Sequence, residues 1–178
     1  MTRPRMAATA SGQFTCRNSG HSVTITVKAM YTPTAPKVTE TGTYVFRNCF
    51  IDPFQGAVLA KFARISLKAE RVALLTANNS PYSVGLSEVL RKDFATRGGT
   101  IVAEQKYTEG EKDFRAQLTA IRAAKPDVVA ATGFYTEAAL ICKQARDLGL
   151  AVPFIGGDGW EAPQLTELGG KAVEGCYY

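Results

Sequence analysis

Histidine, closely spaced cysteines and long apolar runs are all scarce in this sequence of 178 residues. The single histidine, His21, lies in an N-terminal stretch unlike the rest, so a Ser-His-Asp or Cys-His catalytic system has no base on the folded body. Ser87 follows a glycine by two positions but lacks the second glycine of a nucleophile elbow, and no GxxxxGK(S/T) phosphate loop occurs. We therefore expect a protein that is not an enzyme.

The four cysteines lack the spacing of a metal site. Cys16, Cys49, Cys142 and Cys176 include no CxxC pair, so we expect no zinc, and nothing else in the sequence indicates a cofactor. Oxidation would permit three pairings. Cys142 adjoins the apolar stripe of a predicted helix, which favours a small buried hydrophobic residue there.

Acidic residues are absent from the first 37 positions, which hold five of the 21 basic residues. The remainder has 16 residues of each sign, so the net charge of +5 comes from the N-terminal stretch. No cluster of Lys and Arg with interleaved aromatic residues follows, and we expect no nucleic-acid partner. The positive start at Arg3 and Arg5 is followed by too short an apolar stretch for a signal peptide, and no run of residues is long enough to span a membrane.

The composition of residues 1–29 predicts an atypical, poorly ordered arm. One element is expected there, a strand in which Val23, Ile25 and Val27 alternate with polar residues, and no regular element is expected before Ser22. Residues 43–178 differ, because apolar strands alternate with amphipathic helices. Such strands predict a mainly parallel sheet covered on both faces, an α/β fold with three α/β/α layers.

A first helix is predicted from Asp52, with Pro53 at its first turn and a stripe directed inward (Phe54, Val58, Phe62 and Ile65). Further helices are expected in three places. One begins at Pro81 with Leu86, Val89, Leu90 and Phe94 inward, one at Thr108 with Phe114, Leu118 and Ile121 inward, and one covers 136–148 with Ala138, Ile141, Ala145 and Leu148 inward. The strands are expected at 71–76, 100–105, 127–132 and 153–156, with a last one from Ala172 toward Tyr178.

The loops after the strands form the ligand crevice of such sheets. The three loops that matter cover residues 78–82, 133–137 and 156–160; each carries an aromatic residue and two carry a carboxylate.

Several segments resemble the solute-binding proteins of branched-chain amino acid ABC transporters. They read PTAPKVTETG at 33–42, YVFR at 44–47, FIDPFQG at 50–56, GEKDF at 110–114, QARDLGL at 144–150, GGDGW at 156–160 and VEG at 173–175. Their order and spacing cover about residues 32–178. The resemblance implies a type I periplasmic binding protein-like fold, in which two lobes close on an amino acid that is passed to permease subunits of the transporter.

The resemblance assigns the parts of the chain to different places in that clamshell. Residues 30–42 correspond to a remnant of the first lobe and the hinge, and residues 43–178 to the second, C-terminal lobe. The segment at 32–36 is two residues shorter than the family pattern. We expect a fragment, a truncated gene or a shifted reading frame at the front, and a chain that cannot close on its ligand. The resemblance implies a periplasmic location. The alternative is a ligand-sensing domain of a receptor or regulator with the same fold.

The resemblance also implies roles for five residues in an amino-acid site. Asp158 would pair with the ligand ammonium, and Tyr82 and Phe134 would form the wall around the side chain, with Phe134 standing where a tyrosine is common. Tyr135 and Glu137 are weaker candidates. Each has a structural alternative: Asp158 as a turn former, Tyr82 and Phe134 as packing residues, and Glu137 as a helix N-terminal carboxylate. Trp160 is expected to pack rather than to contact ligand.

Overall fold

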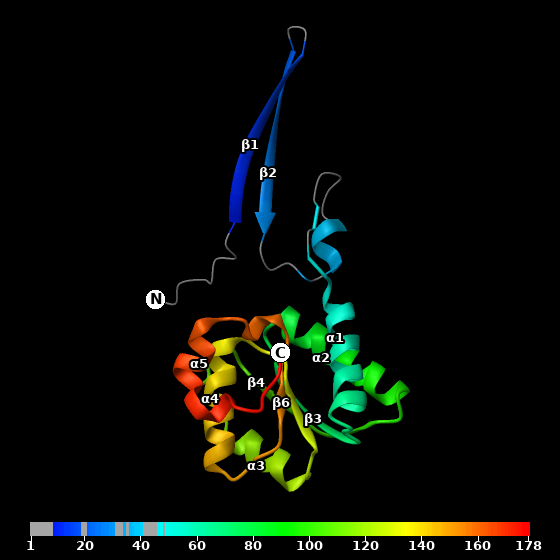
Figure 1. Ribbon diagram of the computed structural model, residues 1–178, viewed down its shortest axis with the longest axis vertical. Coiled ribbons are helices and arrows are strands. Elements are labelled where there is room, and N and C mark those ends of the chain that lie inside the picture. Colours follow the sequence, from blue (N-terminus) through cyan, green and yellow to red (C-terminus); the bar gives the residue numbers. More distant parts are fainter. Residues whose placement is uncertain (1–8, 19–20, 31–33, 35, 41–45, 48) are drawn as a thin grey trace. The chain divides into compact units, whose positions relative to one another are not determined.

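The computed structural model describes residues 9–18, 21–30, 34, 36–40, 46–47 and 49–178. The chain divides into two compact units, residues 1–51 and residues 52–178 (Figure 1). The predictions for residues 1–8 and for most of 41–48 lie outside the described residues. Among those described, no helix is long and apolar enough to cross a membrane.

The first unit contains a hairpin of two ten-residue strands, β1 (Thr9–Asn18) and β2 (His21–Met30). They pair antiparallel, from Thr9 opposite Met30 to Asn18 opposite His21. The strand predicted around Val23–Val27 is confirmed within β2, whereas the prediction of no regular element before Ser22 is wrong. Backbone pairing between the strands supplies hydrogen bonds that need no apolar alternation, so composition alone did not indicate β1. A short 3-10 helix, η1 (Pro36–Glu40), follows.

The second unit is built on four parallel strands in the order β4-β3-β5-β6. These are β3 (Arg71–Ala77), β4 (Thr100–Tyr107), β5 (Val128–Ala131) and β6 (Phe154–Ile155). The helices are α1 (Asp52–Lys61) continued by a π-helical turn η2 (Phe62–Ser66), α2 (Pro81–Thr96), α3 (Arg115–Ala123), α4 (Tyr135–Asp147) and α5 (Pro163–Gly169), with 3-10 turns η3 (Asp158–Trp160) and η4 (Gly170–Val173). The predicted mainly parallel α/β sheet is confirmed.

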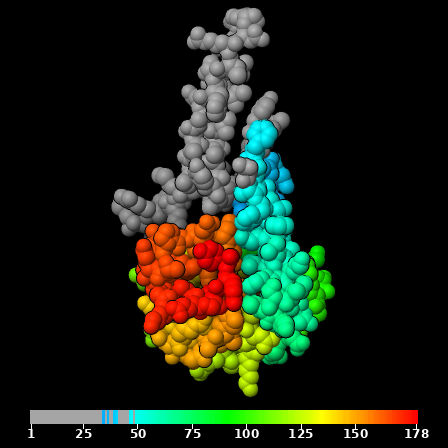
Figure 2. Space-filling view, viewed as in Figure 1, coloured from blue at the N-terminus to red at the C-terminus, as the bar shows by residue number. Residues whose placement is uncertain are grey.

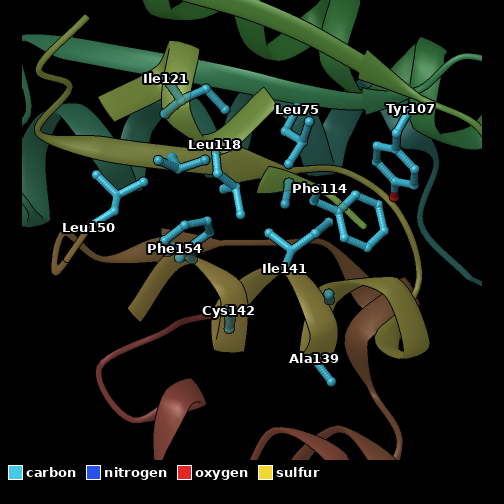
Figure 3. Close-up of a cluster of buried hydrophobic side chains, with 14 of the residues drawn as sticks. Leu75, Tyr107, Phe114, Leu118, Ile121, Ala139, Ile141, Cys142, Leu150 and Phe154 are labelled. Carbon is cyan, nitrogen blue, oxygen red and sulfur yellow. The ribbon is translucent and has the colours of Figure 1, made fainter. Parts of the chain in front are cut away.

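Successive residues of β3 enter two separate cores, one on each face of the sheet. Val72 and Leu74 belong to the layer beneath α1 and α2, whereas Ala73 and Leu75 belong to the layer beneath α3 and α4. Figure 3 shows side chains from the sheet, α3 and α4 meeting in the second layer. Because side chains alternate along a strand, an uninterrupted apolar run is buried on both faces, as the sequence predicted. The predicted inward residues of α2, α3 and α4 are also buried, except Val89 and Leu148, which are half-buried. Helix α3 begins at Arg115 and not at the predicted Thr108.

Helix α1 packs with the face opposite to the predicted one. Phe54, Val58 and Ile65 are 60%, 47% and 58% exposed, while the buried positions of α1 and η2 are occupied mainly by small residues (Gly56, Leu59, Ala60 and Ala63). A Cβ at Gly56 would lie 2.8 Å from the Cβ of Val89 in α2. The two helices approach so closely that small residues must occupy the contact. The predicted inward stripe is therefore wrong for Phe54, Val58 and Ile65, while Phe62 is half-buried against the core.

The strand predicted from Ala172 is also wrong, because Ala172 lies in the 3-10 turn η4. Gly170 at φ 54° and Gly175 at φ 73° turn the backbone on either side of η4. Only Tyr177 reaches the sheet, as an isolated parallel bridge to Ile155. Its N–H donates to the Phe154 carbonyl (2.9 Å), and its carbonyl accepts from the Gly156 N–H (2.9 Å). The chain end thus supports the segment from which the loop after β6 departs.

Candidate functional site

The loops after β3, β5 and β6 bring three of the predicted site residues together. Tyr82 begins α2 after β3, and its hydroxyl donates a hydrogen bond of 2.7 Å to Oδ1 of Asp158, which follows β6. The Tyr82 ring stacks on Phe134, which precedes α4, with ring centroids 5.3 Å apart and an interplanar angle of 29°. Because parallel strands end at one edge of the sheet, side chains 76 positions apart in sequence become neighbours.

Two glycines allow this close approach. A Cβ at Gly157 would lie 2.4 Å from the Tyr82 hydroxyl and 2.6 Å from Oε1 of Gln55. A Cβ at Gly159 would lie 2.9 Å from the Gly133 carbonyl oxygen and close to the rings of Tyr82 and Phe134. The glycines on both sides of Asp158 are therefore required by packing against the aromatic pair, and not by backbone angles.

Burial and negative charge dominate the electrostatics at Tyr82. Desolvation raises the pKa of Tyr82 far above its ordinary value; the charge and hydrogen bond of Asp158 raise it further, and so does the charge of Asp52. The hydroxyl keeps its proton and donates it. None of the ion pairs formed by the described residues includes Asp158. An acidic group beside a stacked aromatic wall suits a ligand with an ammonium group and an apolar body.

Gln55 was not identified as a site residue from the sequence, although it belongs to the segment FIDPFQG. Its Oε1 lies 3.2 Å from the Tyr82 hydroxyl, which also accepts a hydrogen bond of 3.2 Å from the Gly159 N–H. The hydroxyl thus connects the first turn of α1 with the loop after β6. Spacing alone could not show that these two segments meet.

A buried cluster of hydroxyl groups holds the start of α2 against the sheet. Thr132 Oγ1, at the end of β5, lies 2.8 Å from both Ser83 Oγ and Ser87 Oγ, and it donates to the Ser83 carbonyl at 3.1 Å. Ser87 Oγ lies 2.7 Å from Thr76 Oγ1, and Ser83 Oγ accepts from the Ala77 N–H at 2.8 Å. The cluster fixes the turn of α2 that carries Tyr82.

Tyr135 and Glu137 are placed differently from the other three candidates. Oε1 of the buried Glu137 accepts a hydrogen bond of 3.1 Å from the N–H of Gly110, in the loop after β4. In the sheet order β4 and β6 are the two outer strands, so this contact lies toward the edge away from Asp158. Tyr135 packs against the core beneath α4. The structure gives Glu137 a contact that anchors the loop after β4, and it places Tyr135 against the core.

Trp160 packs in the core, as expected. Its side chain is fully buried and Nε1 donates to the Ala131 carbonyl at 3.0 Å, below Gly156, where a Cβ would lie 2.2 Å from the indole. Within the described part of the chain, no three His, Cys, Asp or Glu side chains gather as metal ligands.

A family model described as "Periplasmic binding protein" matches residues 8–178. The chain belongs to the periplasmic binding protein family. The match begins further upstream than the segments that carry the resemblance, and it includes both strands of the hairpin. The Leu/Ile/Val-binding protein BraC3 of Rhizobium johnstonii is 34% identical over 148 residues, which are 83% of this chain and 40% of that protein.

Solved structures of family members superpose on the chain. The leucine-binding protein LivK of Thermotoga maritima has a TM-score of 0.75 and 44% identity, over 80% of this chain and 41% of its own. LivJ of Streptococcus pneumoniae, a branched-chain amino acid transporter substrate-binding protein solved with isoleucine, has a TM-score of 0.74 and 30% identity, over 78% and 40%. The chain therefore spans about two-fifths of the length of these relatives. The recognition of the family from the sequence is confirmed.

Proposed function

We propose that this chain forms one wall of an amino-acid site in a branched-chain amino acid binding protein that serves an ABC transporter. The observation that carries the proposal is the cluster of Asp158, Tyr82 and Phe134 at the carboxyl ends of the strands. Relatives named for binding leucine, isoleucine and valine support it. On the same support we propose a periplasmic location, with the transporter's permease subunits as the partner.

In this proposal the Asp158 carboxylate accepts a hydrogen bond from the ligand ammonium. The Tyr82 hydroxyl holds the Asp158 side chain in place by donating to its Oδ1. The faces of Tyr82 and Phe134 form the apolar wall against the aliphatic side chain. Tyr135 stays a proposed outer contact, and Glu137 a proposed support of the loop after β4. A charge-assisted hydrogen bond contributes about 1.5–3 kcal/mol.

We expect weak binding by the 178-residue polypeptide, because the described residues contact an amino acid from one side. A single charge-assisted bond and one apolar wall supply only a few kcal/mol of binding free energy. A dissociation constant of 1 mM corresponds to ~4 kcal/mol, so we expect a dissociation constant of about 1 mM or more.

Chemical-shift perturbation of the ¹⁵N-labelled chain tests the proposal. Leucine, isoleucine and valine should shift the amides of Tyr82, Phe134 and the loop around Asp158, with saturation in the millimolar range, while 4-methylpentanoate, which lacks the ammonium, should not. Asp158→Asn should abolish these shifts. Asp113→Asn, at an exposed ion pair, is the matched control and should leave them unchanged. Leucine-induced shifts that survive Asp158→Asn, or that map elsewhere, would contradict the proposed site.

A further inference from the structure

Two cysteines outside the ligand site lie in contact beside the second core layer. Cys142 is fully buried in the middle of α4, and Cys176 is half-buried near the chain end. Their sulfur atoms are 3.8 Å apart and both are free thiols. A disulfide bond needs about 2.05 Å between the sulfurs, so side-chain rotation and a small shift of the segment around Gly175 would join them.

The two thiols differ in acidity, and Arg146 lies beside Cys176. This arginine lies one helical turn after Cys142, and its Nη2 is 3.7 Å from Cys176 Sγ. Its Nη1 donates to the carbonyls of Leu150 (2.7 Å) and Val152 (2.9 Å), which fixes the guanidinium in place. The hydrogen bond with Cys142, a backbone hydrogen bond at Phe154 and the charge of Arg146 together outweigh burial and lower the pKa of Cys176 to about 7. The same hydrogen bond and burial raise the pKa of Cys142.

Cys176 can also be reached from solvent. It lines an open surface hollow of about 420 Å³ together with residues of α1, η2 and the chain end (Val58, Leu59, Phe62, Tyr177 and Tyr178). Figure 2 shows the C-terminal residues, in red, at the surface beside α1. Cys142 has no exposed surface. An external reagent should therefore meet Cys176 first.

We propose that Cys142 and Cys176 form a redox-sensitive disulfide that clasps the C-terminal segment onto α4, with a small disulfide such as oxidised glutathione as the oxidant. The Cys176 thiolate attacks one glutathione sulfur, forming a mixed disulfide and releasing a glutathione thiolate. Cys142 then loses its proton and attacks Cys176 Sγ, releasing the second glutathione. The two protein thiols lose two electrons and two protons, and one oxidised glutathione becomes two reduced glutathiones.

The clasp acts on the strand that carries the site loop. Tyr177, directly after Cys176, exchanges backbone hydrogen bonds with Phe154 and Gly156, and its ring makes an edge contact with Phe62 at 5.1 Å between centroids. Joining Cys176 to α4 restrains Tyr177 against β6. The oxidised and reduced chains should therefore differ in the stability of this edge of the sheet.

Peptide mapping after oxidation tests the proposal directly. The reduced full-length chain is incubated with oxidised glutathione, blocked with N-ethylmaleimide and digested with trypsin, which places the four cysteines in separate peptides. We expect residues 123–143 linked to residues 172–178, with a mass lower by two hydrogen atoms than the sum of the reduced peptides. Predominant pairing with Cys16 or Cys49, or no pairing at all, would overturn the proposal.

Single-cysteine variants test the order of the steps. In Cys142→Ser a glutathione adduct should accumulate on Cys176, because the second step is blocked. In Cys176→Ser, Cys142 should stay unmodified while the exposed Cys49 reacts as an internal control. Faster modification of Cys142 than of Cys176 in these variants would refute the assignment of Cys176 as the attacking thiolate. Adduct formation at Cys176 should slow as the pH falls below about 7, since the thiolate is the reactive form.

Discussion

Removing one oxygen from the buried hydroxyl cluster should destabilise the whole second unit. Thr132→Val keeps the shape of the side chain and deletes the acceptor shared by Ser83 and Ser87. One assignment of protons satisfies every contact: Thr76 donates to Ser87, Ser87 and Ser83 donate to Thr132, and Thr132 donates to the Ser83 carbonyl. The variant leaves two buried donors and one carbonyl without these partners.

Each buried polar group left unsatisfied costs about 1–3 kcal/mol, and rotation of the serine hydroxyls toward other acceptors recovers part of that. We therefore expect Thr132→Val to lower the free energy of unfolding by about 2–4 kcal/mol. For a chain of this size, that corresponds to a fall of roughly 4–16 °C in melting temperature. The partners explain the size of the effect, since Ser83 and Thr132 are fully buried.

Urea unfolding followed by the fluorescence of Trp160 measures this change, because Trp160 is the only tryptophan and is fully buried. Thr119→Val is the matched control: its hydroxyl bonds the Arg115 carbonyl on an exposed helix face. It should change stability by less than about 0.5 kcal/mol. Ser87→Ala combined with Thr132→Val should cost less than the sum of the single changes. A loss below about 0.5 kcal/mol for Thr132→Val would refute the reasoning.

Two further predictions concern the site loop and its tyrosine. Gly156→Ala should lower the free energy of unfolding by about 1–3 kcal/mol in the same urea assay, because its Cβ would be forced against the Trp160 indole. Gly85→Ala is the control: no atom lies within 4 Å of its Cβ, so it should be neutral or stabilising. Equal effects of the two changes would contradict the packing argument. Folding raises the pKa of Tyr82, so its contribution to stability is present below about pH 10 and is lost as the pH rises further. Above about pH 10 the free energy of unfolding should therefore fall less steeply with pH in Tyr82→Phe than in the wild type. Parallel pH profiles of the two proteins would count against this.

The alternation of strands and helices was predictable because β3, β5 and β6 are apolar on both faces and each helix from α2 to α4 has an apolar stripe. Helix α1 was not, because its buried face carries Gly56 and Ala60, continued by Ala63 in η2, and Gly56 lies against Val89 of α2. Hydrophobicity marks such small residues weakly, while the larger Phe54 and Val58 stand outward. Periodicity identifies an amphipathic face but does not say how closely two helices approach.

The site shows the same limit. Asp158, Tyr82 and Phe134 were identified from loops that follow parallel strands, and the resemblance to binding proteins supplied their roles. The hydroxyl cluster escaped notice because Ser83, Ser87 and Thr132 have the composition of surface residues, and only the fold brings them together. Glu137 was chosen as a candidate because it follows such a loop, yet its hydrogen bond runs to Gly110.

The three glycines around Asp158 restrict which sequence changes this loop can accept, in design or in evolution. A side chain at position 156 would meet Trp160, and side chains at 157 and 159 would meet the aromatic pair. At the proposed site, selection for folding and selection for ligand therefore act on the same few atoms. A library that seeks new specificity there should hold these glycines fixed and vary Asp158, Phe134 and Tyr82, the residues of the proposed contact.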